Sequence, residues 1–333
     1  MADRKKVYLC DYANHSTTKH WLEYLQANHE VVTDMYCNPI YAEWADVIFC
    51  EWCETSAQQL AKRAGYFTDV YDPAGILGPQ NARYTGTFMW PDAKLFIRPI
   101  DIDIIYGHFN GVEWENVDGM AYIAPHLGNM LTRNKQYPPG MPIVEIPLSV
   151  KLSDWGYRDR PRGTGRQIAW VNHNWAAKNL HLAYLALHDL ILRSGDKSWM
   201  LHVVSNGRSN EHWLFSYLQH LAKTLGIENN IIHYSSVPSI DEFLDDKDFL
   251  WQTSCKEGFS LIMGEAMAKG LHVYSLNWES SKHLWGETPI CDTPGQLATK
   301  TLVDTYDSQF FRDLAETHSH DKEIARLREI TGL

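Results

Sequence analysis

The stretch that most constrains the fold is residues 257–270, which read Glu-Gly-Phe-Ser-Leu-Ile-Met-Gly-Glu-Ala-Met-Ala-Lys-Gly. We interpret it as a turn that runs directly into a short helix. Gly258 permits the tight backbone geometry of the turn, and Ser260 is predicted to be the N-cap residue. Two carboxylates, Glu257 in the loop and Glu265 in the second turn, therefore stand at the open end of the helix.

That open end has the chemistry expected of a nucleotide-sugar site. The first free backbone N–H groups, near Phe259, Ser260 and Leu261, attract phosphate because they have no acceptor within the helix. Glu257 and Glu265 accept hydrogen bonds from hydroxyl groups. A diphosphate between two such carboxylates, with a sugar on one side and a ribose on the other, describes a nucleotide-sugar. The alternative is a surface strand–helix unit with two solvated glutamates, which are common on helices.

The same residues resemble the Glu-x7-Glu signature of retaining GT-B glycosyltransferases of family 4, usually written EGFGLxxxEAMAxGxPV. Two positions depart from it, since Ser260 stands where the family has its second glycine and His272 where it has proline. The resemblance implies an α/β fold of two Rossmann-like doubly wound domains that face a cleft. The matching positions are Glu257, Gly258, Phe259, Leu261, Glu265, Ala266, Met267, Ala268, Gly270 and Val273.

Strand patterns alternate with helix patterns along most of the chain. In the first third, residues 45–52 form an apolar strand pattern, and residues 56–65 form a helix that we expect to end at a glycine C-cap, Gly65. In the last third, residues 249–253 form a strand that leads into the signature. This alternation is typical of parallel sheets with right-handed crossovers.

The length of 333 residues indicates about two domains. The boundary is predicted within residues 137–165, where chain breakers and charges gather. We assign residues 1–150 to an N-terminal acceptor-side domain and residues 151–304 to a C-terminal nucleotide-sugar-binding domain. Residues 305–333 are a helical tail that we expect to pack back towards the N-terminal domain.

A second resemblance lies in residues 168–179, which look like the family's strand and loop vGRxxxxKG. On that match Lys178 takes the position of a phosphate-binding lysine, and His173 takes the position of an arginine. A neutral histidine offers one donor and less charge than arginine. Either the diphosphate is held less tightly or His173 is protonated beside it. Asn172 replaces the usual glycine. Without the resemblance, Lys178 is a solvated lysine at the start of a helix.

The resemblance also assigns residues beside the base and the acceptor. Backbone groups near Ser236 and Val237, in the loop after a predicted strand, would contact the nucleotide base. The family's Gly-Gly acceptor loop is replaced by a polar segment, in which Asn14 and His15 are assigned to the acceptor side. The polar residues that follow them are more simply explained as caps of the next helix.

Asp101 and Asp103 are also assigned to the acceptor side. They neighbour Ile100, which stands where the family often has a histidine near the reacting sugar. The Asp-x-Asp string also mimics the metal motif of the other large glycosyltransferase fold. Such a short match arises often by chance, and GT-B enzymes generally work without a bound metal. We therefore expect no metal ligand and no cofactor other than the donor.

Composition narrows the partner and the compartment. The formal net charge of −11 gives no overall attraction for phosphate polymers. The chain starts with no long apolar h-region, and no apolar stretch approaches about 18 residues. We therefore expect no integral membrane segment and a cytoplasmic location. Cys50 and Cys53 form a lone C-x-x-C with no second pair at zinc-finger spacing, so reduced structural thiols are expected.

The resemblance to family 4 implies a hexosyltransferase that moves a sugar from a nucleoside-diphosphate sugar to an acceptor with retention of anomeric configuration. Lys178, His173 and the helix N-terminus would stabilise the charge that grows on the departing diphosphate without a metal. Glu257, counted with them as catalytic, would hold sugar hydroxyls and orient the donor. Glu265 would hold ribose hydroxyls.

Two other functions and several acceptors stay open. A degenerate GT-B protein would bind a nucleotide-sugar or carbohydrate without turnover, and the substituted N-domain positions favour it. The acceptor is a glycan, a small molecule or a hydroxylated modified base in DNA, and the negative net charge disfavours DNA. A sugar-nucleotide epimerase or dehydrogenase is disfavoured because no G-x-G-x-x-G follows the first strand.

Overall fold

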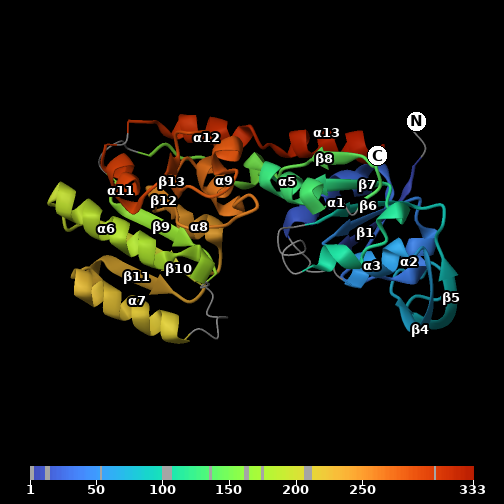
Figure 1. Ribbon diagram of the computed structural model, residues 1–333. Helices are drawn as coiled ribbons and strands as arrows, with labels where there is room; N and C mark the ends of the chain where they lie inside the picture. The colour runs from blue at the N-terminus through green and yellow to red at the C-terminus, as the bar shows by residue number, and fades with distance from the viewer. Residues whose placement is uncertain are drawn as a thin grey trace. The chain divides into compact units, whose positions relative to one another are not determined.

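The chain divides into two compact units, Met1–Leu148 with His320–Leu333, and Ser149–Ser319. The predicted tail, residues 305–333, therefore contributes one helix to each unit. Figure 1 shows the elements of both. The structure is a computed structural model that describes residues 4–11, 16–52, 55–99, 107–134, 137–160, 165–173, 176–205, 212–303 and 305–333.

The first unit is built on a parallel sheet in the order β2-β1-β3-β6-β7-β8. The strands are β1 (Lys6–Asp11), β2 (Glu30–Asp34), β3 (Val47–Glu51), β6 (Lys94–Arg98), β7 (Gly119–Tyr122) and β8 (Ile143–Glu145). The helices are α1 (Ser16–Asn28), α2 (Pro39–Trp44), α3 (Thr55–Ala61), α5 (Pro125–Asn134) and α13 (His320–Thr331), with 3-10 turns η1 (His108–Gly111) and η2 (Trp114–Asn116).

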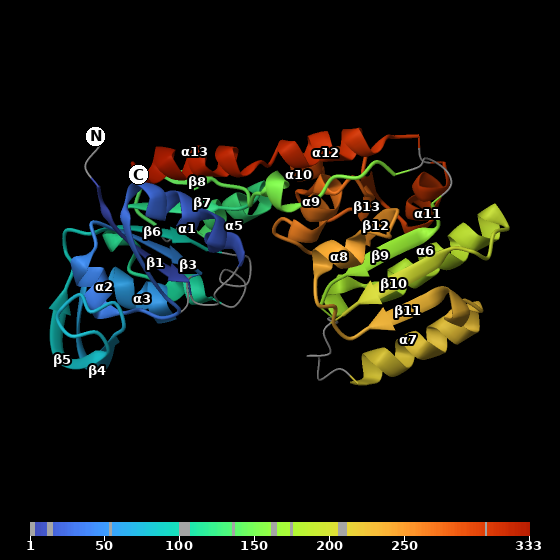
Figure 2. The ribbon, with the colours of Figure 1, turned by 180° about the vertical axis from the view of Figure 1, so that it is seen from behind.

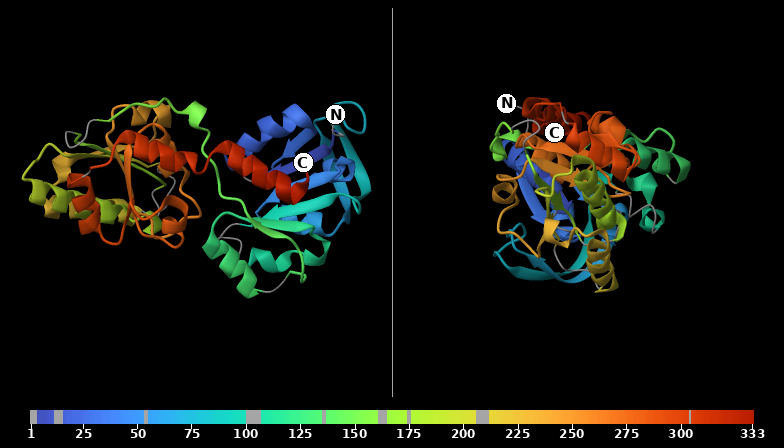
Figure 3. Two further views of the ribbon diagram at one scale, coloured as in Figure 1. Left: turned by 90° about the horizontal axis from the view of Figure 1, so that it is seen from above. Right: turned by 90° about the vertical axis from the view of Figure 1, so that its left-hand side faces the viewer.

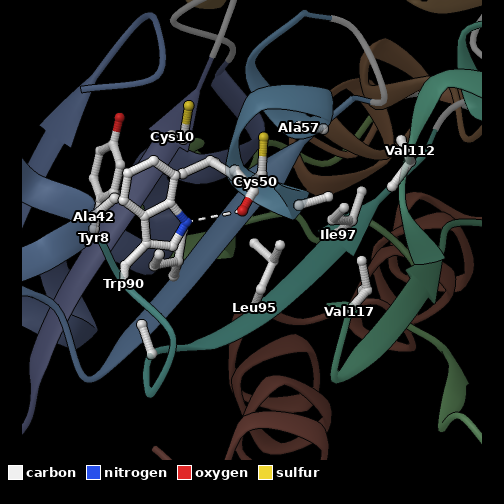
Figure 4. Packing of buried hydrophobic residues seen from close by; sticks show 14 of the residues in the cluster. Tyr8, Cys10, Ala42, Cys50, Ala57, Trp90, Leu95, Ile97, Val112 and Val117 are labelled. Carbon is white, nitrogen blue, oxygen red and sulfur yellow. Dashed lines mark hydrogen bonds between the residues drawn. The ribbon is translucent and has the colours of Figure 1, made fainter. Parts of the chain in front are cut away.

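Successive side chains along each strand point to opposite faces of the sheet, so the first unit has two hydrophobic cores, one on each face. On one face, alternate strand residues such as Leu9 and Phe49 pack against Trp21 of α1 and Leu327 of α13. Helices α1 and α13 lie side by side there (Figures 1 and 3). On the other face, residues such as Tyr8 pack with α2, α3 and the segment before β6. Figure 4 shows part of that second core. Period-2 burial on both faces is what a covered parallel sheet requires.

An antiparallel hairpin, β4 (Ala64–Asp72) and β5 (Ala82–Met89), follows α3 and contacts α2 (Figure 2). The sequence did not predict it, and the prediction that Gly65 caps a helix is wrong. Helix α3 ends at Ala61, and Arg63 adopts the positive φ of 61° at the turn. The Arg63 carbonyl accepts a hydrogen bond from the Trp90 N–H, and its guanidinium bonds the Asn116 carbonyl. These tertiary bonds begin a strand where the local pattern favours helix.

The second unit has a parallel sheet in the order β11-β10-β9-β12-β13-β14. Its strands are β9 (Gln167–Val171), β10 (Met200–Val204), β11 (Ile231–Tyr234), β12 (Phe249–Gln252), β13 (His272–Leu276) and β14 (Ile290–Cys291). Its helices are α6 (Leu180–Ser194), α7 (His212–Leu225), α8 (Ile240–Leu244), α9 (Leu261–Ala268), α10 (Ser281–Trp285), α11 (Pro294–Leu302) and α12 (Ser308–Glu316), with 3-10 turns η3 (Leu152–Asp154), η4 (Ala176–Lys178) and η5 (Glu228–Asn230).

The strand order of the second sheet reverses between β9 and β12. The chain builds outwards from β9 through β10 to β11, then returns to β12 and builds the other way. Right-handed crossovers in the two directions place their helices on opposite faces of the sheet. The carboxyl ends of β9 and β12 therefore meet at a switch point that no crossover covers, which is where doubly wound sheets bind ligands.

A buried charge cluster ties the first unit together. Arg98, at the end of β6, pairs with Glu51 at the end of β3, and its Nη1 lies 3.4 Å from Glu323 Oε1 on α13. All three side chains are at most 3% exposed. The guanidinium also lies over the ring of Trp21 on α1, 4.3 Å from the ring centroid. Two strands and two helices thus depend on one cation.

Replacing Arg98 by methionine should lower the free energy of unfolding by about 3–5 kcal/mol, because two carboxylates are left buried without their cation. Arg83→Met is the matched control, since Arg83 and Asp69 form a pair whose side chains are 59% and 69% exposed. It should cost less than about 1 kcal/mol. Urea unfolding measures both, and hydrogen exchange should place the loss in β6 and α13. Equal losses in the two variants would contradict this account.

Candidate functional site

The candidate site lies at the β9–β12 switch point and is organised by a residue that the sequence did not single out. Gln252 ends β12 and is 1% exposed. Its Oε1 accepts hydrogen bonds from Asn172 Nδ2 at 2.7 Å and from the Thr253 N–H and Ser254 Oγ at 3.1 Å each. Asn172 directly follows β9. The amide oxygen therefore joins the ends of the two strands.

The amide nitrogen of Gln252 points to the signature loop. Its Nε2 donates to Ser260 Oγ at 2.8 Å and to Glu257 Oε1 at 3.3 Å. One side chain thus makes hydrogen bonds through both its oxygen and its nitrogen, and every partner lies at the switch point. A buried amide with all its groups bonded fixes the geometry of what surrounds it.

Lys178 and Glu257 meet at this point from loops after different strands. Lys178 Nζ lies 2.6 Å from Glu257 Oε1, and the two side chains are 14% and 13% exposed. The loops are tied at a second level, because Thr253 Oγ1 donates to the Lys178 carbonyl at 2.9 Å and the Cys255 N–H donates to the Ala177 carbonyl at 3.0 Å. The two loops are therefore joined by these hydrogen bonds as well as by the ion pair of their side chains.

Ser260 occupies the predicted N-cap position of α9, but its side chain does not cap the helix. Its φ and ψ are 65° and 75°, in the left-handed region. That conformation favours glycine, the residue the signature has here. The hydrogen bond from Gln252 holds the Ser260 hydroxyl away from the helix. The first N–H groups of α9 consequently gain no acceptor from a cap and stay available to an anion.

Two neighbouring residues in the signature differ in exposure. Phe259 is 2% exposed and packs against Trp285 and His318, with ring centroids 4.8 and 5.0 Å away. Its carbonyl accepts a hydrogen bond from Trp285 Nε1. The Phe259 side chain therefore anchors the loop, and only its backbone N–H fits the predicted donor role. Leu261, the first residue of α9, is half-buried.

Glu265 lies in the second turn of α9, as predicted, and its side chain is half-buried. Burial raises the pKa of its carboxyl to about 7, because desolvation disfavours the charged form. Its carboxylate makes no hydrogen bond with another residue in the described parts of the chain. A carboxyl in this environment gains from a hydroxyl partner that arrives with a ligand.

The remaining predicted residues spread along the same sheet edge or lie outside the described residues. His173 is exposed just after β9. Ser236 is exposed and Val237 is half-buried in the loop after β11, two strands from β9 at the carboxyl edge. The acceptor-side candidates Asn14, His15, Asp101 and Asp103 fall outside the described residues, as does Cys53.

Among the side chains that can be placed, no group of three or more His, Cys, Asp and Glu residues is arranged to hold a metal ion. The helices within the described ranges include none that is long and apolar enough to cross a membrane. Neither observation bears on residues 100–106, which include the two aspartates of the Asp-x-Asp string.

Comparison with known families supports this view of the second unit. Residues 160–324 match the family model described as "Glycosyl transferases group 1". The match covers nearly all of the second unit, including β9, β12 and α9. A search of curated protein sequences found no match.

Solved structures resemble the whole chain. A glycosyltransferase from Rickettsia africae has a TM-score of 0.66 at 12% identity, with 98% of this chain and 99% of that chain covered. Anabaena Alr3699/HepE, in complex with UDP and glucose, has a TM-score of 0.65 at 11% identity, with the same coverage. TarM has a TM-score of 0.59 at 13% identity. That match covers 85% of this chain but only 54% of TarM, so the chain spans about half the length of TarM. At these identities the likeness shows the fold, and the predicted α/β class with two Rossmann-like domains of the GT-B type is confirmed.

Replacing Gln252 by methionine, which has a similar size, should lower the free energy of unfolding by at least about 2 kcal/mol. The reason is that the buried Ser254 and Ser260 hydroxyls lose a partner and pay a desolvation cost. Gln219→Met on the exposed face of α7 is the control and should change stability by less than about 0.5 kcal/mol. Urea denaturation measures both variants, and a loss no larger in the Gln252 variant would remove its organising role.

The raised pKa of Glu265 predicts a pH-dependent stability. Between the ordinary value of 4.5 and about 7, the unfolded chain releases this proton and the folded chain retains it, so folding becomes less favourable as pH rises. The Glu265→Gln variant lacks this loss, and its advantage over the wild type should grow from pH 4.5 to 7 and then level off. The gain should not exceed about 3 kcal/mol, since water reaches part of the carboxyl. A constant difference between pH 4.5 and 8 in thermal unfolding would contradict the assignment.

Proposed function

We propose that this protein is a glycosyltransferase that takes its sugar from a nucleoside-diphosphate sugar. The observation that carries the proposal is the meeting of Lys178 and Glu257 at the switch point of the second sheet, beside the uncapped N-terminus of α9, the helix that carries Glu265. The match to the glycosyl transferase model over residues 160–324 supports it. The UDP in the similar Anabaena structure favours a uridine diphosphate sugar as the donor.

Departure of the diphosphate is the step that needs most help. Negative charge grows on the phosphate oxygen as its bond to the anomeric carbon breaks, and Lys178 with the N–H groups of α9 would stabilise that charge. The backbone that carries both groups is held in place, since the Lys178 loop is bonded to the loop after β12 and α9 packs against β12 and β13. Preorganised groups of this kind lose little free energy to rearrangement during the reaction. His173, at the exposed end of β9, is a further candidate donor to the phosphates.

The two carboxylates would hold the two ends of the donor. Glu257 would accept hydrogen bonds from hydroxyls of the transferred sugar and orient the anomeric carbon. Glu265, in the second turn of α9, would accept hydrogen bonds from the ribose hydroxyls. Backbone groups near Ser236 and Val237 would contact the base.

We further propose that transfer retains the anomeric configuration and needs no metal. The acceptor hydroxyl would attack from the face that the diphosphate leaves, and its proton would pass to the departing phosphate oxygen. That route needs no strong nucleophile or base, which matches the absence of the family's usual histidine at Ile100 in the sequence. The acceptor is a hydroxyl compound for which Asn14, His15, Asp101 and Asp103 stay predicted contacts.

The full-length protein should be tested against UDP-, GDP-, ADP- and TDP-glucose by thermal shift, then by proton NMR for donor hydrolysis or transfer. Binding at a hundredfold excess over Kd stabilises the folded protein by about 2.7 kcal/mol. We expect one base to be preferred and the released sugar to keep the donor's anomeric configuration. Turnover should persist in excess chelator and fall more steeply than donor binding in Lys178→Ala.

Three results would contradict the proposal in different ways. Binding of no nucleotide would remove the function. Binding with no turnover on any acceptor would favour the degenerate binding protein. Loss of activity in chelator, restored by manganese or magnesium, would assign metal binding to residues such as Asp101 and Asp103.

A further inference from the structure

Glu257 forms an ion pair with Lys178, the cation proposed to receive the diphosphate. The 2.6 Å contact between Lys178 Nζ and Glu257 Oε1 joins residues from two loops, and both side chains are largely buried. Glu257 is the only carboxylate that pairs with Lys178 among the residues the structure describes. The cation proposed to receive the diphosphate is therefore already neutralised by an anion of the protein.

From this we infer that Glu257 binds the Lys178 ammonium at the position that the donor phosphate takes. When the donor binds, Glu257 leaves Lys178 and accepts hydrogen bonds from hydroxyl groups of the sugar. The inference rests on the proposed function. A diphosphate that reached Lys178 would lie close to the Glu257 carboxylate in a site with little water. Like charges that share such a site repel each other. The carboxylate must then leave the ammonium or raise the free energy of the complex.

The surroundings of Glu257 allow this exchange. Its Oε2 makes no hydrogen bond with any described residue, so one oxygen is available for a hydroxyl group. Its Oε1 also accepts from Gln252 Nε2 at 3.3 Å, a partner that does not depend on Lys178. Glu257 stands in the loop between β12 and α9 rather than inside a helix, so its backbone is not fixed by helical hydrogen bonds.

The exchange would distinguish the donor from the product. A nucleoside-diphosphate sugar brings hydroxyl groups that the displaced Glu257 can accept, so both charges are satisfied in the complex. A nucleoside diphosphate takes Lys178 and offers Glu257 no hydroxyl in return, which leaves a largely buried carboxylate with one long hydrogen bond. The site would therefore bind the product less tightly than its contacts with Lys178 and α9 alone would allow, and this favours release after transfer.

The test compares UDP with the unreactive donor analogue in which a methylene group replaces the glycosidic oxygen of UDP-glucose. Calorimetry gives Kd for both ligands in the wild type and in Glu257→Gln, which has the same shape and no charge. We expect the affinity for UDP to rise about tenfold, as one charge-assisted hydrogen bond no longer competes for Lys178. The affinity for the analogue should stay constant or fall, because an amide is a weaker hydroxyl acceptor than a carboxylate.

Glu287→Gln is the matched control. Glu287 pairs with Lys282 on α10, its side chain is 79% exposed, and the variant removes the same unit of charge from the same sheet unit. Its affinities for both ligands should match those of the wild type within about twofold, as expected for a screened charge at a distance. If Glu257→Gln does not fold, Glu257→Ala removes the same competing charge and must also raise the affinity for UDP.

The outcomes separate this inference from the proposed function. Unchanged or weaker UDP binding in the folded Glu257 variants would overturn the exchange while the glycosyltransferase proposal stands. An equal rise for UDP and the analogue would also overturn it, since Glu257 would then make no contact with the sugar. If the wild type binds neither ligand and no other nucleoside diphosphate, the proposed function fails and the exchange fails with it.

Discussion

The hydrogen bonds of one buried amide hold the site of the second unit in place. The ends of β9 and β12 meet at the switch point, where the crossovers leave in opposite directions. Gln252 joins these loops through its oxygen and nitrogen, from a strand residue that is 1% exposed. These hydrogen bonds to a strand residue restrain the loops that carry Lys178 and Glu257.

The sequence predicted the regular parts of the fold well because each rests on a local signal. The strands predicted at residues 45–52 and 249–253 lie close to the observed β3 and β12, because a run of apolar residues marks each of them. The hairpin β4–β5 was missed for a tertiary reason. Arg63 adopts a positive φ that the pattern assigned to Gly65, since its guanidinium and carbonyl are bonded to residues after β5. No window of local sequence contains those partners.

The site shows the same division between local and distant information. Glu257 and Glu265 belong to one short motif, and Lys178 was found through a resemblance in another. Gln252 had no such signal, because a single polar residue at the end of the apolar run Phe249-Leu-Trp-Gln looks like the edge of a core strand. Likewise the N-cap rule gave the position of Ser260 but not its left-handed conformation. That conformation becomes understandable only when the Gln252 amide is seen to hold its hydroxyl.

Buried charge has opposite consequences in the two units. Around Arg98, two carboxylates and an aromatic ring enclose a fully buried guanidinium, so any change of partner would leave charges in the core, and the cluster is structural. Lys178 and Glu257 are 14% and 13% exposed, one carboxylate oxygen has no bond to a described residue, and an uncapped helix end lies beside them. A pair with an unused acceptor next to an anion site has a lower barrier to exchange than one sealed on all sides. Burial alone therefore does not decide whether an ion pair stabilises a fold or serves a binding site. The deciding property is whether each charged group can form hydrogen bonds with another partner when the pair separates.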